Sequence, residues 1–361
     1  MMSEKSKQHV ESCRFCWMCH HICPIGNATG LERNTARARA LGLSLVNRGA
    51  IALSEVIDNV YECACCGACV HDCTTGWDPV MFTKEARLDA AMEGVLPEYI
   101  NALVENCLET GNAYGITEVD ANLSKAIGKH LDKTEIVLFI GVDARYKVPE
   151  AAVNAIKVLE KAGVKFTVLA NEPASGQQLE YLISASNETK EQMSACANVL
   201  NDYAKVVVYD PQDAKVMKRE YKEWGVNLEA EVVTFTSFLA ELLDAGKLGA
   251  KQSGKEVTYQ DPFQLARDLG QTEEPRKVVS AFATLKEMLC NSGDTMWAGN
   301  LLMKEWMNDV MLCVAESRIR NAKGVKTDTI VTASVSEYAS LKAVAQDEVK
   351  ILSMEELILG E

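Results

Sequence analysis

One cysteine spacing occurs twice near the N-terminus and constrains this chain more than any other feature. The spacing is Cys-x2-Cys-x2-Cys-x3-Cys, and its two copies are separated by 39 residues. Bacterial ferredoxins hold [4Fe-4S] clusters with such a run. The repetition therefore predicts two [4Fe-4S] clusters as cofactors, held by Cys13, Cys16, Cys19, Cys23, Cys63, Cys66, Cys69 and Cys73.

The fourth cysteine of each run is expected to serve the opposite cluster. In two-cluster ferredoxins, three cysteines of one run hold one cluster and the fourth ligates the other. The ligands predicted for cluster 1 are therefore Cys13, Cys16, Cys19 and Cys73. The ligands predicted for cluster 2 are Cys63, Cys66, Cys69 and Cys23. No catalytic residue is predicted.

Structural zinc is the alternative explanation of such cysteines. Zinc sites pair two ligands with a second, distant pair, whereas each run here has four cysteines, so iron–sulfur clusters are favoured. The insert between Cys23 and Cys63 is too long for a small βαββαβ ferredoxin. We therefore expect an α-helical ferredoxin domain, with Cys65 as a spare thiol outside the spacing and Trp17 shielding the first cluster.

Length and charge narrow the class further. The chain has 361 residues, 48% of them apolar, which is enough for two or three domains with sizeable cores. Its net charge of -14 and the absence of a basic face argue against binding nucleic acid. No apolar run is long enough for a membrane span, and no secretory signal is evident. We expect a cytoplasmic protein, which would reach a membrane through a partner or a surface helix.

The remaining cysteines do not suggest disulfides. They are odd in number and widely scattered, and thiolates kept for iron indicate a reducing compartment. The five are Cys65, Cys107, Cys196, Cys290 and Cys313. The last three lie on apolar segments, and we expect them to be buried and inert.

The pattern of apolar residues divides the chain. Within residues 1–130 the pattern predicts helices over 32–46, 50–60, 80–92 and 97–108. A linker is expected at 111–128, where a loop leads into a short helix. Beyond it, short β-branched runs alternate with helices, which indicates mostly parallel sheets. The expected strands are 136–140, 164–169, 206–209, 232–234, 256–259, 328–332 and 349–352.

A weak internal repeat suggests that the α/β region is duplicated. A strand, a helix, a second strand and a helix occur near residues 206–243 and again near 329–359. The expected fold is α+β and multidomain. Its domains are an α-helical dicluster ferredoxin over 1–130 and two α/β halves over 131–250 and 251–361.

This combination resembles the iron–sulfur subunits of flavin dehydrogenases. Similar proteins are the iron–sulfur subunits of glycolate oxidase and of anaerobic glycerol-3-phosphate dehydrogenase, the lactate-utilisation iron–sulfur protein and the heterodisulfide reductase subunits. In that family each α/β half carries a Cys-Cys-Gly motif and further cysteines. Here other residues stand at the matching positions, which are Val142, Ala174, Ser175, Asp210, Asp213, Phe263, Thr295, Met296, Ser334 and Glu337.

The resemblance implies a function. It suggests an electron-transfer subunit that relays electrons between a partner FAD-containing dehydrogenase or reductase and another carrier. That carrier would be an electron-transfer flavoprotein, a quinone or a further iron–sulfur protein. The alternative is a heterodisulfide-reductase-like catalytic subunit with a non-standard site in the α/β region, but a third cluster would need thiolates that are missing. A ligand there would be sought in a crevice of Asp210, Asp213, Asp261, Arg267 and Trp297.

Overall fold

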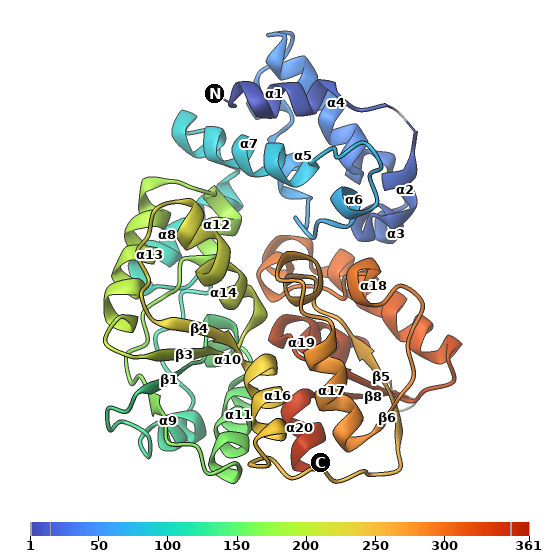
Figure 1. Ribbon diagram of the computed structural model, residues 1–361. Helices are drawn as coiled ribbons and strands as arrows, with labels where there is room; N and C mark the ends of the chain where they lie inside the picture. Colours follow the sequence, from blue (N-terminus) through green and yellow to red (C-terminus); the bar gives the residue numbers. More distant parts are fainter. Residues whose placement is uncertain (1, 15, 347–348, 361) are drawn as a thin grey trace.

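The computed structural model describes residues 2–14, 16–346 and 349–360. Phe15, inside the first cysteine run, lies outside the described residues. Figure 1 shows an N-terminal helical part above two α/β halves that lie side by side. The N-terminal elements are α1 (Glu4–Glu11), α2 (Met18–Ile22), α3 (Pro24–Thr29), η1 (Glu32–Asn34), α4 (Ala36–Asn47), η2 (Leu53–Glu55), α5 (Ile57–Tyr61), α6 (Ala68–His71), α7 (Pro79–Glu93), α8 (Glu98–Thr110) and α9 (Ala121–Ile127).

The two longest N-terminal helices confirm the predictions from periodicity. Helices α7 and α8 begin and end within two residues of the expected bounds. The helix expected over 32–46 is interrupted, because Thr35 adopts an extended conformation and its side chain caps α4 at Ala38. The single helix expected over 50–60 is wrong: Val56 has ψ 0° and separates a 3-10 turn from the short α5.

The first α/β half is built around a four-stranded parallel sheet. Its strands are β1 (Ile136–Phe139), β2 (Thr167–Val168), β3 (Lys205–Val208) and β4 (Glu231–Thr234), in the order β2-β1-β3-β4. The strands are continuous apolar runs because helices cover both faces of a parallel sheet. These helices are α10 (Val142–Tyr146), α11 (Pro149–Lys161), α12 (Gln177–Ile183), α13 (Asn187–Leu200), α14 (Pro211–Lys215), the π-helix η3 (Val216–Glu220), α15 (Tyr221–Glu223) and α16 (Phe235–Asp244).

The second half repeats this arrangement. Its strands are β5 (Glu256–Gln260), β6 (Thr284–Leu285), β7 (Thr329–Thr332) and β8 (Lys350–Ser353), in the order β6-β5-β7-β8. All the strand pairs are parallel. The accompanying elements are the π-helix η4 (Gln264–Asp268), α17 (Glu273–Phe282), η5 (Ser292–Asp294), α18 (Leu301–Gly324), α19 (Val335–Val344) and α20 (Met354–Leu359).

The matching strand orders account for the internal repeat in the sequence. Strand β3 pairs with β4 as β7 pairs with β8, and α16 and α20 follow the second strand of each pair. Two details differ from expectation: the strand predicted over 164–169 shortens to β2, and β6 was not predicted. Both strands have only two residues, which is too short for a periodic pattern to register. The domain boundaries remain a prediction.

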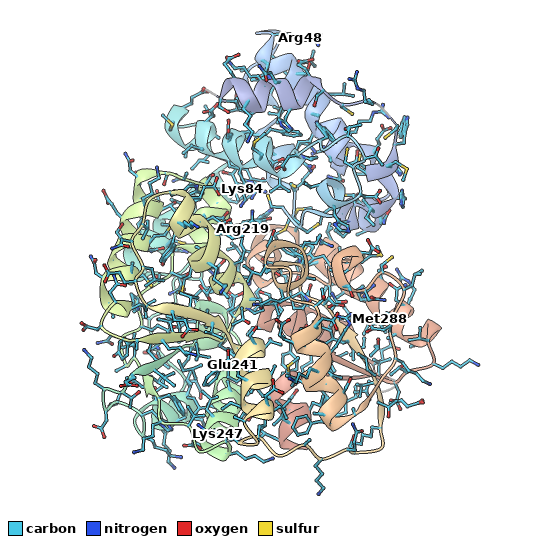
Figure 2. The ribbon with its side chains drawn as sticks, viewed as in Figure 1. Arg48, Lys84, Arg219, Glu241, Lys247 and Met288 are labelled. Carbon is cyan, nitrogen blue, oxygen red and sulfur yellow. The ribbon has the colours of Figure 1, made fainter. Side chains whose placement is uncertain are left out.

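The three parts share packed interfaces. One hydrophobic core runs through both α/β halves, from Leu138 and Val207 to Tyr259 and Ile330. A second core joins the N-terminal helices to Leu182 of α12. Charged contacts reinforce these junctions, and Figure 2 labels Lys84 and Arg219 at them.

Two sets of ion pairs cross these junctions. Lys84 of α7 pairs with the buried Glu180 of α12 and lies 3.6 Å from Glu220. Arg219 of η3 reaches across to Asp268 of η4 at 2.8 Å and so joins the two halves. The helical part is therefore held against both halves of the α/β region.

Candidate iron–sulfur centre

The two cysteine runs fold into matching loops. In each loop the residue after the second cysteine has left-handed backbone angles: Trp17 has φ 67° and ψ 3°, and Gly67 has φ 72° and ψ 1°. Each of these residues begins a short helix that carries the third cysteine, Cys19 in α2 and Cys69 in α6. Both loops thus turn around a centre in the same way, although only the second uses the residue suited to that conformation.

The structure brings Cys23 to the cysteines of the second run. Burial raises the pKa of the Cys69 thiol well above its usual value, and the charges of Cys63, Cys66 and Cys23 add to the effect. Burial also raises the pKa of Cys23 to about 11, again with contributions from Cys66 and Cys63. Cys23 thus lies within range of the charges of the second run, which is compatible with the crossed assignment of cluster 2. The assignment itself remains a prediction.

The thiols of the first run also lie together. Burial raises the pKa of Cys19, and the charges of Cys13 and Cys16 raise it further. Cys73 is half-buried just after α6, with its Sγ 3.2 Å from the hydroxyl of Thr75. Its role as the fourth ligand of cluster 1 remains a prediction.

The two loops differ sharply in exposure. In the first, Cys16 is exposed and 47% of Trp17 is accessible, so the expected shielding by Trp17 is incomplete. In the second, Cys66 is buried in an apolar cluster with Phe263 and Trp297 of the second half. The sequence could not reveal this difference, because the covering residues Phe263 and Trp297 lie 197 and 231 positions after Cys66.

A buried arginine supports the second loop. Arg87 of α7 is fully buried and donates hydrogen bonds to the carbonyl oxygens of Cys63 (2.7 Å), Val60 (3.2 Å) and Tyr181 (2.7 Å). Its guanidinium lies over the rings of Tyr61 and Tyr181, at 4.9 and 4.4 Å from their centroids. Tyr181 also donates from its hydroxyl to the Cys63 carbonyl at 2.7 Å. The backbone at Cys63 is thus held in place by two side chains.

The charge of Arg87 is not balanced by a carboxylate. No ion pair of Arg87 occurs among the described residues. Burial by itself would lower the pKa of Arg87, but its electrostatic interactions with Cys65, Tyr181 and Cys63 raise it overall. A buried cation without an anion is costly, and a cluster with its four thiolates is a negatively charged group. The residues therefore fit a [4Fe-4S] cluster beside Arg87.

Two further arginines approach the same thiols. Arg39 is buried and donates to the carbonyl oxygens of Asn59 and Asn34 at 3.0 and 3.2 Å. Arg267 of η4 donates to the Cys66 carbonyl at 2.9 Å. Nothing in the sequence marked these arginines or Arg87 as part of the site, because an arginine has no spacing that links it to a distant loop.

Cys65 occupies a special place beside the ligand positions. It has a left-handed φ of 50°, and its backbone N–H donates to Cys63 Sγ at 3.3 Å. The hydrogen bond with Cys65 is the main reason why the pKa of Cys63 falls well below its usual value, and it raises the pKa of Cys65 correspondingly. A thiol that donates to a ligand sulfur fits the interpretation of Cys65 as a non-ligand.

Among the described residues, no three His, Cys, Asp or Glu side chains are arranged to hold a single metal ion.

In the first α/β half, positions that match family cysteines meet at the carboxyl ends of β1 and β3. Ser175 donates a hydrogen bond to Asp213, and the charge of Asp210 raises the pKa of Asp213 after the larger effect of burial. Burial raises the pKa of Asp210 to about 7, and its Oδ2 has no hydrogen-bond partner among the described residues. Gly141 fits closely here, since a Cβ would lie 2.2 Å from Asp213 Oδ2.

The second half has a similar buried acid. Glu337 ends the segment that matches the family's Cys-Pro-x-Cys, and it accepts hydrogen bonds from the backbone of Ala298 (3.3 Å) and from Gln260 (3.4 Å). Burial raises the pKa of Glu337 to about 8. Hydroxyl and carboxyl groups thus stand where the family has thiols.

A network of hydrogen bonds connects the polar groups at the sheet ends of the two α/β halves. Asp143 accepts hydrogen bonds from Gln212 (3.1 Å) and from Ser336 of the second half. Asn300 also donates to Gln212 at 2.8 Å. This network joins the carboxyl ends of both sheets through polar side chains.

Two expectations for the α/β region are wrong. The proposed crevice does not form, because Asp210, Asp213, Asp261 and Trp297 are all buried. Asp261 and Arg267 also contact different parts of the protein. Asp261 pairs with Arg276 at 2.8 Å, whereas Arg267 donates a hydrogen bond to the carbonyl oxygen of Cys66. The other concerns the cysteines expected to be buried: Cys196 is buried, but Cys290 is partly exposed and Cys313 is exposed. A polar residue at the end of a strand in a tightly packed sheet can be enclosed as easily as it can line a cleft.

Paired cysteine loops on helices, followed by two parallel α/β sheets, define an iron–sulfur protein of the electron-transport class. The chain is 26% identical to a dihydromethanophenazine:CoB–CoM heterodisulfide reductase subunit of Methanosarcina acetivorans, over 90% of this chain and 86% of that protein. It is 21% identical to a fumarate reductase (CoM/CoB) subunit of Methanothermobacter marburgensis, over 97% and 72%. These relatives confirm the resemblance to heterodisulfide reductase and iron–sulfur dehydrogenase subunits.

Other comparisons add less. The EtfAB:quinone oxidoreductase of Syntrophomonas wolfei is 29% identical over 62% of this chain, which spans only 33% of that protein. No family model matches the chain. Glutamate racemase RacE1 of Bacillus anthracis aligns with 63% of this chain and 79% of its own at 12% identity, but its TM-score of 0.30 carries no argument. Among the described residues, no helix is both long and apolar enough to cross a membrane.

Proposed function

We propose that this protein is an iron–sulfur subunit that relays single electrons between a partner flavoprotein dehydrogenase or reductase and a second redox carrier. The relatives are iron–sulfur subunits of reductases, which supports the general role. When bound, a [4Fe-4S] cluster takes up and releases one electron at a time. A flavin exchanges two electrons, so two neighbouring one-electron centres would accept the two electrons of the partner's flavin one at a time.

The pair of unequal loops is the observation that carries this proposal. The second cysteine of the first run, Cys16, is exposed, whereas the equivalent Cys66 of the second run is buried. Cys23 belongs to the first run and lies with the second, so the two sets are tied together at close range. An exposed centre beside a buried one is suited to passing electrons from the surface inward or back.

The chain's own residues would prepare the inner centre for negative charge. Arg39, Arg87 and Arg267 place positive charge near the thiols of the second loop, and each is held by backbone carbonyls. Such charges favour the reduced, more negative form of a cluster and so raise its potential. The apolar cover of Phe263 and Trp297 excludes water from the same side.

The α/β region supports a relay more than the catalytic alternative. A catalytic cluster there would need thiolates, but Ser175, Asp210, Asp213 and Glu337 occupy the matching positions. The carboxyl groups have raised pKa values and lie in closed, hydrogen-bonded surroundings. We propose that this region packs the inner cluster.

The proposal is tested by the metal content of protein purified without oxygen. About eight irons and eight sulfides per chain, with an EPR spectrum of two interacting centres after reduction by dithionite, are expected for two cubanes. Clearly more iron, or a separate third signal, would favour the catalytic alternative. Iron-free protein that cannot be reconstituted would reject the relay.

A further inference from the structure

An exposed apolar surface surrounds the first cysteine loop. Trp17 and Met18 follow the exposed Cys16 and are 47% and 44% accessible, and Leu41 and Leu45 of α4 are each 44% accessible. We call these five residues the outer face. Single exposed apolar residues are ordinary, but a group around a functional loop marks an interaction site.

The geometry of α4 makes this group continuous with the loop. Residues 37, 41, 45 and 48 fall within one narrow sector of a helix with 3.6 residues per turn. Arg37 lies at the loop end of this stripe, with its guanidinium 3.6 Å from the centroid of the Trp17 ring. Figure 2 shows Arg48, at the other end, at the pole of the molecule farthest from the α/β halves. The Arg48 end of this stripe thus lies far from the α/β halves.

The segment that carries the outer face is basic, whereas the whole protein is acidic. Residues 12–48 contain five arginines and one glutamate, whereas the chain as a whole carries -14. Arg14, Arg33 and Arg48 of this segment are exposed, the last two in ion pairs with Glu62 and Glu11. A basic rim around an aromatic and aliphatic centre is a composition that recurs at protein interfaces.

We propose that the outer face docks an acidic redox protein and that electrons enter or leave the chain there. The inference rests on the proposed relay function and adds the place and the charge of the partner. In the reducing direction, one electron leaves the two-electron-reduced flavin of the partner and enters the cluster held at Cys16. No bond of this chain forms or breaks. The basic rim would steer the acidic partner toward the exposed loop.

The test compares two pairs of exposed leucines. The variant L41D/L45D places two negative charges on the outer face, and the control L131D/L289D places the same two charges elsewhere, on residues that are 52% and 75% accessible. The probe is an acidic flavodoxin in its fully reduced form, mixed with the cluster-loaded full-length protein in a stopped-flow instrument. Iron content and the dithionite-reduced EPR signal of each variant verify that its clusters are intact.

The inference predicts a selective loss. The bimolecular rate constant at low salt should fall roughly tenfold in L41D/L45D and stay within about twofold in L131D/L289D, and the wild-type rate should fall as salt rises. Equal rates in both variants, or no reduction of the wild type by flavodoxin, would overturn the outer face as the docking site. The relay function itself fails only if dithionite produces no cluster signal.

Discussion

The N-terminal part and the α/β halves differ in the buried ionisable groups that they carry: arginines in the first, carboxyl groups in the second. Around Cys63 and Cys66, arginines lie without carboxylate partners in the described part of the chain, so the protein presents uncompensated positive charge to its thiols. At the ends of the sheets, Asp210 and Glu337 are buried, each with one oxygen that no described residue contacts by a hydrogen bond, and their pKa values rise to about 7 and 8. The first environment suits an added anionic group, and the second suits neutral, protonated acids. The difference indicates which region is prepared for a cluster.

The largest expected effect is on metal content. Replacing Cys66 or Cys23 by Ala should remove about half of the iron and the same spectral component, because both residues are assigned to cluster 2. Cys16→Ala and Cys73→Ala should remove the other component. Iron analysis and EPR of the four variants measure this.

A matched control is Cys313→Ala, which changes an exposed cysteine of α18 and should keep all the iron. Loss of the same component in Cys23→Ala and Cys16→Ala would contradict the crossed assignment. The comparison of the two regions would then lose its basis, since the arginines would no longer face a defined set of ligands.

The next effect is on stability. Arg87→Met should lower the free energy of unfolding by about 3–5 kcal/mol, because three buried carbonyl groups lose their donor and the thiols lose a cation. Arg48→Met, at an exposed ion pair, should change it by less than about 1 kcal/mol. Denaturant titration under anaerobic conditions compares the two. Equal losses would show that burial of Arg87 has no special role.

The buried acids predict a dependence on pH. The folded pKa values of Asp210 and Glu337 lie above the unfolded value of about 4, so their stabilising protonated forms are fully present below pH 4 and are lost as pH rises through about 7 to 8. Stability should therefore fall from pH 6 to pH 8.5. Glu337→Gln should flatten this profile and raise the free energy of unfolding at pH 8.5 by about 2 kcal/mol.

Glu180 supplies a control of opposite sign. Burial alone would raise its pKa, but Lys215 and Lys84 lower it to about 2. Its stabilising charge is present above pH 4 and is lost only as pH falls toward 2, so Glu180→Gln should destabilise the protein throughout pH 6–8.5. Thermal unfolding across this range measures both variants. An unchanged profile in Glu337→Gln would mean that its carboxylate is solvated.

The smallest effect concerns the two left-handed residues of the loops. Gly67→Ala should destabilise the protein by about 1 kcal/mol, because φ of 72° is unfavourable for a side chain. Trp17→Gly should be nearly neutral, since relief of the same strain offsets the lost contact with Arg37. Thermal unfolding of the two variants checks this. A large loss in Trp17→Gly would mean that the ring shields its loop more than its exposure indicates.

Periodicity predicted much of the secondary structure. Helices α7 and α8 and strands β1, β3, β4, β5, β7 and β8 lie where their patterns placed them. The failures were the interrupted helix over 32–46, the helix over 50–60, the strand over 164–169 that shortens to β2, and the unpredicted β6. In each failure the decisive feature was the backbone angles of a single residue or the pairing of two residues. Such a feature is too short to produce a periodic pattern of apolar residues.

The sequence alone determined the two equal cysteine runs of the N-terminal part, and because ligand spacing is local, these runs by themselves predict how each loop would wrap a cluster. Only the tertiary structure decided that the second loop is buried and the first exposed, and that Arg87, Arg39 and Arg267 surround the inner thiols. It also decided that Ser175 meets Asp213 at the sheet edge. Burial and charge at a point depend on residues that are distant in the chain, and their proximity is created only when the helices and sheets pack.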